Sequence, residues 1–198
     1  MDAATNHVIR KIGLRRNPAA TRAALVCAAR QEFEECGFDA TQSSSIARRA
    51  GYAPQTFYRH FADKVDILLA AYADWHADEQ HAISTVGDAR EAARVLLRYH
   101  RASMKLRQAL RTLSITEERV RAARAKSRMR SVAYLRTHLP HAGELGEAQL
   151  LRSVLLLERT VDAYAEDDLA DPNTSPDQAE QRLCVYLQQE FGPPSQAA

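Results

Sequence analysis

The sequence predicts an all-α protein with a small N-terminal domain followed by a larger helical bundle. Glycine and proline are scarce, with seven of each in 198 residues. No segment alternates apolar and polar residues between turn clusters, as the strands of a half-buried sheet do. Apolar residues instead recur at spacings of three and four along most of the chain. These observations favour helices throughout.

The first predicted helix is marked by its start and its end. Asn17 is a capping residue, and Pro18 suits the first helical turn, where a missing N–H costs nothing. Gly37, followed by Phe38, ends the run. The apolar positions between them fall at helical spacing: Leu25, Ala28, Ala29 and Phe33.

Residues 41–64 predict two short helices joined by a tight turn. Ile46, Ala47 and Ala50 lie on one face of the first of these helices, and Gly51 supplies the turn. Pro54 fits the first position of the second helix. This layout is typical of a helix-turn-helix, which makes binding in a DNA groove the leading hypothesis.

The second short helix has a polar face suited to DNA. At about 100° per residue, Phe61 falls close to Phe57, whereas Gln55 and Arg59 fall on the opposite side. The flanks carry hydroxyl groups that would meet phosphates in a major groove. The alternative is an ordinary amphipathic helix whose polar face meets only solvent.

The first third of the chain resembles the DNA-binding domain of the tetracycline-repressor (TetR) family. The matching residues, in order, are Leu25, Ala28, Ala29, Phe33, Gly37, Phe38, Ile46, Ala47, Ala50, Gly51, Thr56, Phe57, Tyr58, Phe61, Lys64 and Leu68. So many matches in order, without a gap, make a specific signal.

The resemblance implies a set of DNA-contacting residues. They are Gln42, Ser43 and Ser44 on the first short helix, and Pro54, Gln55, Thr56, Tyr58, Arg59 and His60 on the second. Lys64 matches the lysine that holds a phosphate in the family. The chain departs from the family pattern at Gln42, Ser43 and Ala53, where a capping threonine, a small apolar residue and a capping serine are common. Thr41 is a candidate to replace the first cap.

Charge is distributed unevenly along the sequence. Residues 1–65 carry a net +4, residues 66–143 a net +6 and residues 144–198 a net −8, which sum to +2. A basic front part suits a protein that presents one end to a polyanion, although solvated helix faces also vary in sign. Residues 1–17 form a basic arm that either enters a minor groove or serves only as a solubilising terminus.

Neither a membrane nor an oxidising compartment is expected. The longest apolar run, residues 67–73, is seven residues long, far below the roughly twenty that span a bilayer. Cys27 and Cys36 lie on opposite sides of one helix and cannot pair with each other. We expect a cytoplasmic protein with reduced thiols, and a thiol sensor at Cys184 is the alternative.

The C-terminal part predicts helices at about 64–84, 88–114, 117–138, 145–168 and 176–191. In the second of these, an apolar seam at spacings of four and three includes two hydroxyl residues, Tyr99 and Ser103. Such hydroxyls either line a ligand cavity or bond to local carbonyls in an ordinary core. The candidate cavity for a small-molecule effector consists of Tyr72, Trp75, Tyr99, Ser103, Met104 and Met129.

The helix around residues 150–164 has a wide apolar face. Its apolar residues cover an arc of roughly 160°, and Leu156 lies outside it. One packing partner is not enough for this, so we expect the last two helices to pack on a second copy as well. The TetR resemblance implies the same four-helix dimer contact. Candidate interface residues are Leu151, Leu155, Leu156, Leu183 and Leu187; a large monomeric core is the alternative.

One stretch of the chain is strongly basic. It comprises Arg119, Arg121, Arg124, Lys126, Arg128 and Arg130, which no single helix face can hold. We expect most of them to be solvated. They would help to guide DNA; the alternative is that one or two turn inward to hold an anionic effector such as an acyl-coenzyme A or a carboxylate.

The sequence gives no reason to expect an enzyme, a cofactor or a metal site. His76 and His81 are five residues apart and diverge on a helix, and no phosphate-binding glycine loop or nucleophile elbow is present. The domain organisation we expect is a basic arm at 1–17, a helix-turn-helix DNA-binding domain at 18–64, and an effector-binding and dimerisation domain at 65–198.

The TetR resemblance implies a one-component transcriptional regulator, usually a repressor. It would bind a palindromic double-stranded DNA operator as a homodimer, with recognition helices about 34 to 36 Å apart, and be released by a small-molecule effector. The alternatives are an effector-independent architectural DNA-binding protein and, third, a helical enzyme carrying a DNA-binding fold.

Overall fold

The computed structural model describes residues 17–139, 145–168 and 176–192, and these residues are helical without a strand among them. The prediction of an all-α fold is confirmed. The helices are α2 (Pro18–Ala40), α3 (Ser43–Arg49), α4 (Pro54–Tyr58), α5 (Lys64–Ser84), α6 (Ala89–Ala102), α7 (Met104–Thr116), α8 (Glu118–His138), α9 (Glu147–Ala165) and α10 (Pro176–Phe191). Apart from Asn17, the predicted basic arm lies outside the described residues.

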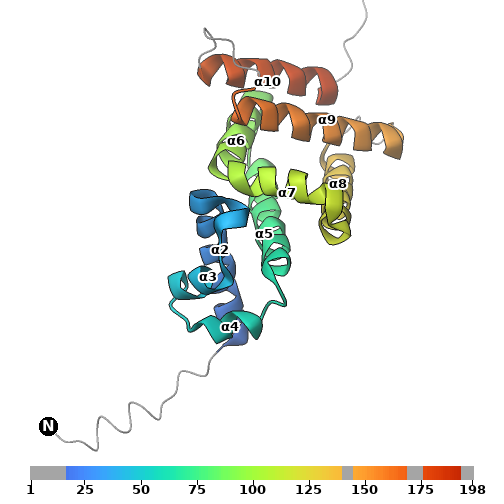
Figure 1. Cartoon of the computed structure of the whole chain (residues 1–198). Coiled ribbons are helices and arrows are strands. Elements are labelled where there is room, and N and C mark those ends of the chain that lie inside the picture. The colour runs from blue at the N-terminus through green and yellow to red at the C-terminus, as the bar shows by residue number, and fades with distance from the viewer. Residues whose placement is uncertain (1–16, 140–144, 169–175, 193–198) are drawn as a thin grey trace, which may run out of the picture.

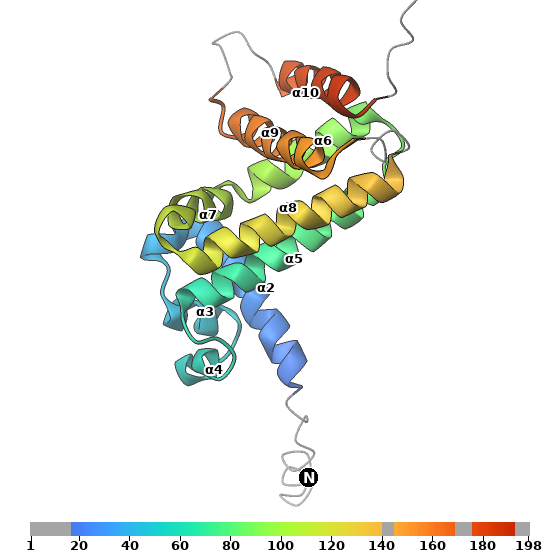
Figure 2. The same cartoon turned by 90° about the vertical axis from the view of Figure 1, so that its right-hand side faces the viewer.

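The helices are arranged so that α3 and α4 lie at one end of the molecule and α9 and α10 at the other. The long helix α5 runs from the α4 end towards α6, with α8 along its side (Figures 1 and 2). Because α5 begins directly after the helix-turn-helix and continues into the bundle, it is the physical connection between the two parts. Within the described residues, no helix is long and apolar enough to cross a membrane.

Local signals in the sequence produce the helix-turn-helix as expected. The Asn17 side chain accepts hydrogen bonds from the backbone N–H of Ala19 (3.0 Å) and Ala20 (3.4 Å), which caps α2. Gly37 (φ 79°) interrupts α2 near its end, and Gly51 (φ 80°) makes the turn between α3 and α4. Both positions require a positive φ, which strains any residue that carries a Cβ.

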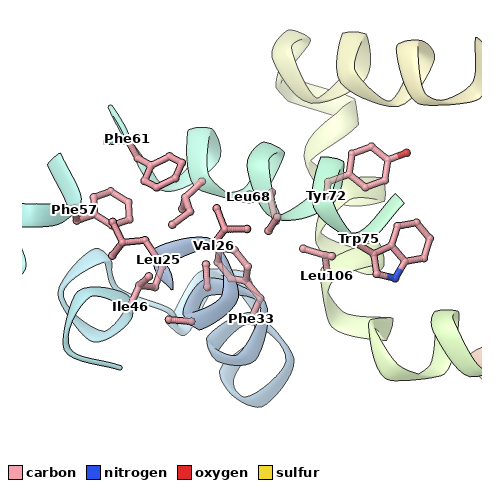
Figure 3. Packing of buried hydrophobic residues seen from close by; sticks show 14 of the residues in the cluster. Leu25, Val26, Phe33, Ile46, Phe57, Phe61, Leu68, Tyr72, Trp75 and Leu106 are labelled. Carbon is pink, nitrogen blue, oxygen red and sulfur yellow. The ribbon is translucent and has the colours of Figure 1, made fainter. Parts of the chain in front are cut away.

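One buried apolar cluster runs from the helix-turn-helix into the bundle (Figure 3). It includes Phe33 of α2, Phe57 of α4, Leu68 and Trp75 of α5, and Leu106 of α7. All five side chains are at most 1% exposed. The helix-turn-helix is therefore not connected by a flexible linker; it shares one hydrophobic core with the first helices of the bundle.

The prediction of a single helix at 88–114 is wrong, because the helix is interrupted at Ser103. Ser103 has φ −134° and ψ 33°, which ends α6 and starts α7 in a new direction. The break divides the predicted seam between two cores. Leu96 packs with α9 and α10, whereas Leu106 and Leu110 join the cluster of α2 and α5.

Candidate nucleic-acid interface and buried charge network

The short helix α4 presents a polar face to solvent. Phe57 is 0% exposed and Phe61 is 2% exposed, so both rings anchor the segment. Gln55 and Arg59 are exposed, in the orientation that the sequence predicts. Because α4 ends at Tyr58, Arg59 is its C-cap residue and Phe61 lies just beyond the helix. Their contacts with DNA remain a prediction.

The other predicted contact residues surround this face. Gln42, Pro54 and Tyr58 are exposed, with Tyr58 at 65%, and its ring lies edge-on against Phe57 at 5.2 Å. The remaining ones are half-buried: Ser43, Ser44, Thr56 and His60. They belong to α3 and the residue directly before it, to α4 or to the residues directly after α4, and together they form one candidate surface.

Gln42 is the N-cap residue of α3 and forms a capping box with Ser45, so Thr41 is not the cap. The Ser45 Oγ accepts from the backbone N–H of Gln42 at 3.3 Å. Thr41 is 2% exposed, and its hydroxyl lies within hydrogen-bond distance of the carbonyls of Gly37 (2.7 Å) and Glu32 (3.2 Å). The expectation that Thr41 caps α3 is therefore wrong, because its hydroxyl bonds back to α2.

Lys64 bonds to backbone carbonyls in the free chain. Its Nζ lies 2.7 Å from the Phe38 carbonyl oxygen, 3.1 Å from that of Thr41 and 3.2 Å from that of Asp39. It also lies 4.3 Å from the centre of the Phe38 ring. An ammonium group has three N–H donors, and three carbonyls take them up. In this conformation Lys64 joins the start of α5 to the end of α2 and has no N–H left for a phosphate.

Arg22 is a basic residue beside this surface that sequence reasoning missed. It is exposed on α2, and its guanidinium lies 4.9 Å from the centre of the Phe61 ring. Stacking on an aromatic ring holds a guanidinium in place while leaving its N–H groups available. The signal in the sequence was an arginine near the start of the first helix whose nearest acidic residue on the C-terminal side, Glu32, is ten positions away.

Residues 25–71 match the model of the bacterial regulatory proteins of the tetR family. The chain carries a TetR-family DNA-binding domain. The resemblance expected from the sequence is thereby confirmed, and the match covers α3 and α4 together with most of α2 and the start of α5.

Solved structures share the TetR-type fold over almost their whole length. A TetR-family transcriptional regulator from Rhodococcus sp. is 19% identical, with a TM-score of 0.67, and the match covers 87% of this chain and 99% of that one. A transcriptional regulator from Saccharomonospora viridis in complex with choline is 20% identical, with a TM-score of 0.64, 86% of this chain and 96% of that one. The multidrug binding protein EbrR complexed with imidazole is 17% identical, with a TM-score of 0.62, 88% of this chain and 97% of that one. No curated protein sequence matches the chain.

The predicted effector-cavity residues divide into buried and exposed ones. Tyr72 and Trp75 are 5% and 1% exposed, with their rings stacked at 6.1 Å, and Ser103 is 7% exposed at the helix break. Tyr99 and Met104 are half-buried. Met129 is 39% exposed on α8, so in this chain it does not join Tyr72 and Trp75 in a common lining.

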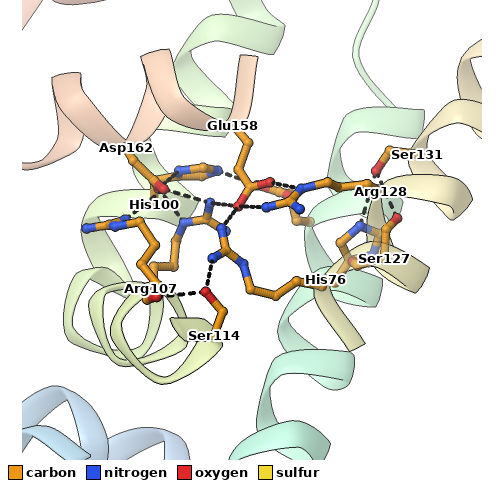
Figure 4. A network of polar contacts seen from close by, with 12 residues as sticks. His76, His100, Arg107, Ser114, Ser127, Arg128, Ser131, Glu158 and Asp162 are labelled. Carbon is orange, nitrogen blue, oxygen red and sulfur yellow. Dashed lines mark hydrogen bonds and ion pairs between the residues drawn. The ribbon is translucent and has the colours of Figure 1, made fainter. Parts of the chain in front are cut away.

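A buried network of charges lies at the centre of this TetR-type bundle (Figure 4). Glu158 of α9 accepts hydrogen bonds from Arg124 (2.5 Å) and Arg128 (2.7 Å) of α8. The guanidinium of Arg107, in α7, lies 3.6 Å from the same carboxylate. Burial alone would raise the pKa of Glu158, but the hydrogen bond from Arg128 and the charges of Arg107 and Arg124 outweigh it and lower the pKa to about 2.

Asp162, one turn further along α9, holds the second part of the network. Its carboxylate accepts from Arg107 Nε (2.5 Å) and Arg111 (2.7 Å), and lies 2.8 Å from His100 Nδ1. Arg111 also pairs with Glu166. Burial would raise the pKa of Asp162, but the bonds and charges of His100 and Arg107 hold it well below its usual range. Side chains of the four helices α6, α7, α8 and α9 are thus joined in one polar network.

Two expectations for the basic stretch meet different outcomes. Arg119, Arg121, Lys126 and Arg130 are exposed, which confirms that most of the stretch is solvated, whereas Arg124 and Arg128 turn inward. Their partner is a carboxylate of the chain itself, which sequence reasoning missed. The available signal was that Glu158 and Asp162 fall within the wide apolar arc of their own helix, where a charge needs a partner.

The predicted dimer-interface residues also divide. Leu155 and Leu156 of α9 are 38% and 46% exposed, and Leu151 is half-buried. Leu183 and Leu187 of α10 are 0% and 8% exposed because they pack with α6 and α9 in a core cluster of the same chain. The expectation for these two residues is corrected: within one chain their side chains already have partners.

Proposed function

We propose that the protein is a transcriptional regulator that binds a palindromic operator as a homodimer and is released from it by a small-molecule effector, so that it acts as a repressor. The observation that supports DNA reading most directly is the geometry of α4. Phe57 and Phe61 are buried while Gln55 and Arg59 face solvent. A helix held in this way offers its polar face to the edges of base pairs.

The residues of this surface would have different roles in DNA binding. Gln55 has the donor and acceptor that pair with adenine, and Arg59 has the fork that pairs with guanine. Gln42, Ser43, Ser44, Pro54, Thr56, Tyr58 and His60 would position the helix against sugars and phosphates, which fix register without reading sequence. Arg22, whose guanidinium is exposed beside Phe61, would add a phosphate contact.

The dimer would form through α9 and α10. Leu155 and Leu156 of α9 and Val185 of α10 are 38 to 46% exposed, and the two helices lie side by side at the end of the molecule opposite α4 (Figure 1). Large exposed apolar side chains on neighbouring helices indicate an interaction site. A twofold axis there would set two α4 helices about one turn of duplex apart, about 34 to 36 Å.

Effector binding in the bundle would reach the DNA through α5 and α7. The buried cluster that contains Phe57 also contains Trp75 and Leu106, so the two parts share packing contacts. An effector that binds better when the two α4 helices are away from one-turn spacing must weaken operator binding by the same factor. Two solved structures of this fold are complexes with choline and with imidazole, which supports a small-molecule effector.

Selection of DNA from a random-sequence pool tests the proposal. The full chain is expected to enrich an inverted repeat with half-sites centred about one helical turn apart. Added small molecules that bind the bundle are then expected to lower the affinity for the selected DNA. Enrichment of no common sequence would contradict operator reading, and an affinity that no bound small molecule alters would favour an architectural DNA-binding protein.

A further inference from the structure

We propose that the effector is an anion with a carboxylate or similar group, which takes the place of Glu158 on the guanidinium groups of Arg124 and Arg128. This rests on the proposed function for the existence of an effector and adds its chemical class. The chemical class follows from what the charge network of α7, α8 and α9 recognises.

Glu158 occupies a site built for a carboxylate. Arg128 approaches it with two nitrogens, Nε at 2.7 Å and one terminal nitrogen at 3.4 Å, and Arg124 donates at 2.5 Å. Arg107 lies 3.6 Å away on a third side. Planar guanidinium forks match the geometry of a carboxylate better than an ammonium does. Any other carboxylate of suitable size would meet the same three donors.

An effector carboxylate could replace that of Glu158 without a preformed empty cavity. The Glu158 side chain retains 14% of its exposure and that of Arg128 retains 20%, whereas Arg124 and Arg107 retain 5% and 6%. The site therefore has an inner wall of two enclosed guanidiniums and an outer side that water reaches. A rotation of the Glu158 side chain towards that side would hydrate its carboxylate and free the space it now fills.

Displacement of the Glu158 carboxylate would favour an anion over a cation at this site. The guanidinium groups of Arg124 and Arg128 would lose their carboxylate partner, and Arg107 would keep only Asp162. An anion compensates these positive charges, whereas a cation adds to them. Because charge pairs with few water contacts interact strongly, the vacated site is biased towards an anion.

Displacement of Glu158 would act on the parts that lead to the DNA. Glu158 is the group that joins α9 to both α7 and α8 through Arg107, Arg124 and Arg128. The first turn of α8 in turn pairs with the cap of α5, because Arg119 lies 2.9 Å from Asp63. Loss of the Glu158 contacts therefore frees α8 to move relative to α9, while Arg107 and Arg111 still hold α7 to α9 through Asp162. Movement of α8 would reach the start of α5, directly after the helix-turn-helix, through the pair of Arg119 with Asp63.

The test compares three probes of one size and different charge, namely benzoate, benzamide and benzyltrimethylammonium. An aromatic ring is chosen because Trp75 lies against Arg107, with the guanidinium 4.6 Å from the ring centre. Binding to the full chain without DNA is measured by calorimetric titration. We expect saturable binding of benzoate and at least tenfold weaker binding of the neutral and cationic probes. Equal binding of all three, or preference for the cation, would overturn the proposal.

Matched variants identify the site. Glu158→Gln removes the internal anion and is expected to bind benzoate at least tenfold more tightly than the native chain. Arg128→Gln is expected to bind it at least tenfold more weakly, whereas Lys126→Gln, which removes the same charge from an exposed position of α8, leaves the affinity unchanged. Equal effects of Arg128→Gln and Lys126→Gln, or no benzoate binding even to folded Glu158→Gln, would overturn it. Folding of each variant is checked by circular dichroism. If Glu158→Gln does not fold, the comparison of Arg128→Gln with Lys126→Gln decides.

The outcome separates this inference from the proposed function. If benzoate binds with the expected order among the variants but leaves the affinity for the selected DNA unchanged, the anion site stands and effector control of the operator fails. If instead a neutral or cationic compound releases the DNA and benzoate does not bind, effector control stands and the anion site fails.

Discussion

The carboxylate of Glu34 in α2 accepts a hydrogen bond from the backbone N–H of Leu106 in α7 at 2.8 Å. The same carboxylate accepts from the backbone N–H of Lys105 at 3.2 Å. Ser103, the N-cap residue of α7, makes no side-chain capping bond, so Glu34 supplies the acceptor that the start of α7 lacks. A helix of the DNA-binding domain thus caps a helix of the bundle, which ties the orientation of α7 to that of the helix-turn-helix.

Glu34→Ala is expected to weaken the contact between α2 and the start of α7. Loss of a capping acceptor costs about 1 kcal/mol of stability, and the backbone amides of Lys105 and Leu106 would exchange with solvent faster. Hydrogen exchange on the native and variant chains measures this directly. Gln31→Ala, an exposed change on the same helix, is the control and is expected to leave those amides unchanged. Equal protection of Leu106 in native and Glu34→Ala chains would show that the cap is unimportant.

The break at Ser103 illustrates what periodicity does not reveal. The apolar spacing from Leu96 to Leu110 continues across the break, so a single helix is the natural prediction from the sequence. The group that stabilises the new helix start is Glu34, 72 positions away from Leu106. A cap supplied from so far along the chain leaves no local signal.

Lys64→Ala is expected to lower stability rather than to remove a phosphate contact. Three carbonyl acceptors at the end of α2 would lose their donor, which costs about 1 to 2 kcal/mol for a half-buried charged group. Denaturant unfolding measures this loss. In DNA titrations at several salt concentrations, the slope is expected to stay unchanged for Lys64→Ala and to flatten by about one unit for Arg22→Ala. Flattening of the slope by Lys64→Ala to the same extent would restore the role that the family resemblance implies.

Stability is expected to fall in acid because of Glu158. Its pKa of about 2 in the folded chain lies below the ordinary value of 4.5, so the unfolded chain binds the proton more readily. The stabilisation is complete above about 4.5 and is lost as the pH falls from there through about 2, by roughly 3 kcal/mol in total. Unfolding free energies across this range are expected to fall less steeply in Glu158→Gln than in the native chain. The control Glu147→Gln, at a residue whose side chain is 61% exposed, should follow the native curve; identical curves for all three chains would exclude this role of Glu158.

Leu155 and Leu156 are expected to hold the dimer together. A double change to glutamate would place two charges on the exposed apolar part of α9, which disfavours its burial against a second copy. Sedimentation is expected to show a dimer for the native chain and a monomer for the double variant. Ile115→Glu introduces the same chemistry at a 77% exposed residue at the end of α7 and should remain dimeric. A dimer that survives the double change would place the interface elsewhere.

The recognition helix and the charge network differ in how far sequence reasoning could reach. The orientation of Phe57, Gln55 and Arg59 follows from the angle between neighbouring residues, so the sequence alone predicts it correctly. Arg124 and Glu158 lie 34 positions apart on different helices, and only the packing of α8 against α9 brings them together. The packing of α10 against α6 and α9 explains why Leu183 and Leu187 are buried within one chain, although their spacing suited a dimer contact.

Selection of DNA sites by Arg59→Ala tests whether α4 reads base pairs in each half of a symmetric operator. The native chain and the variant are each used to enrich sites from the same random pool, at the same salt concentration. If α4 reads bases as a symmetric pair, the variant is expected to lose preference at one base pair in each half-site, at symmetric positions, and to retain the rest of the inverted repeat. An unchanged preference at every position would contradict base reading by Arg59, and a selected site without twofold symmetry would contradict the dimeric regulator.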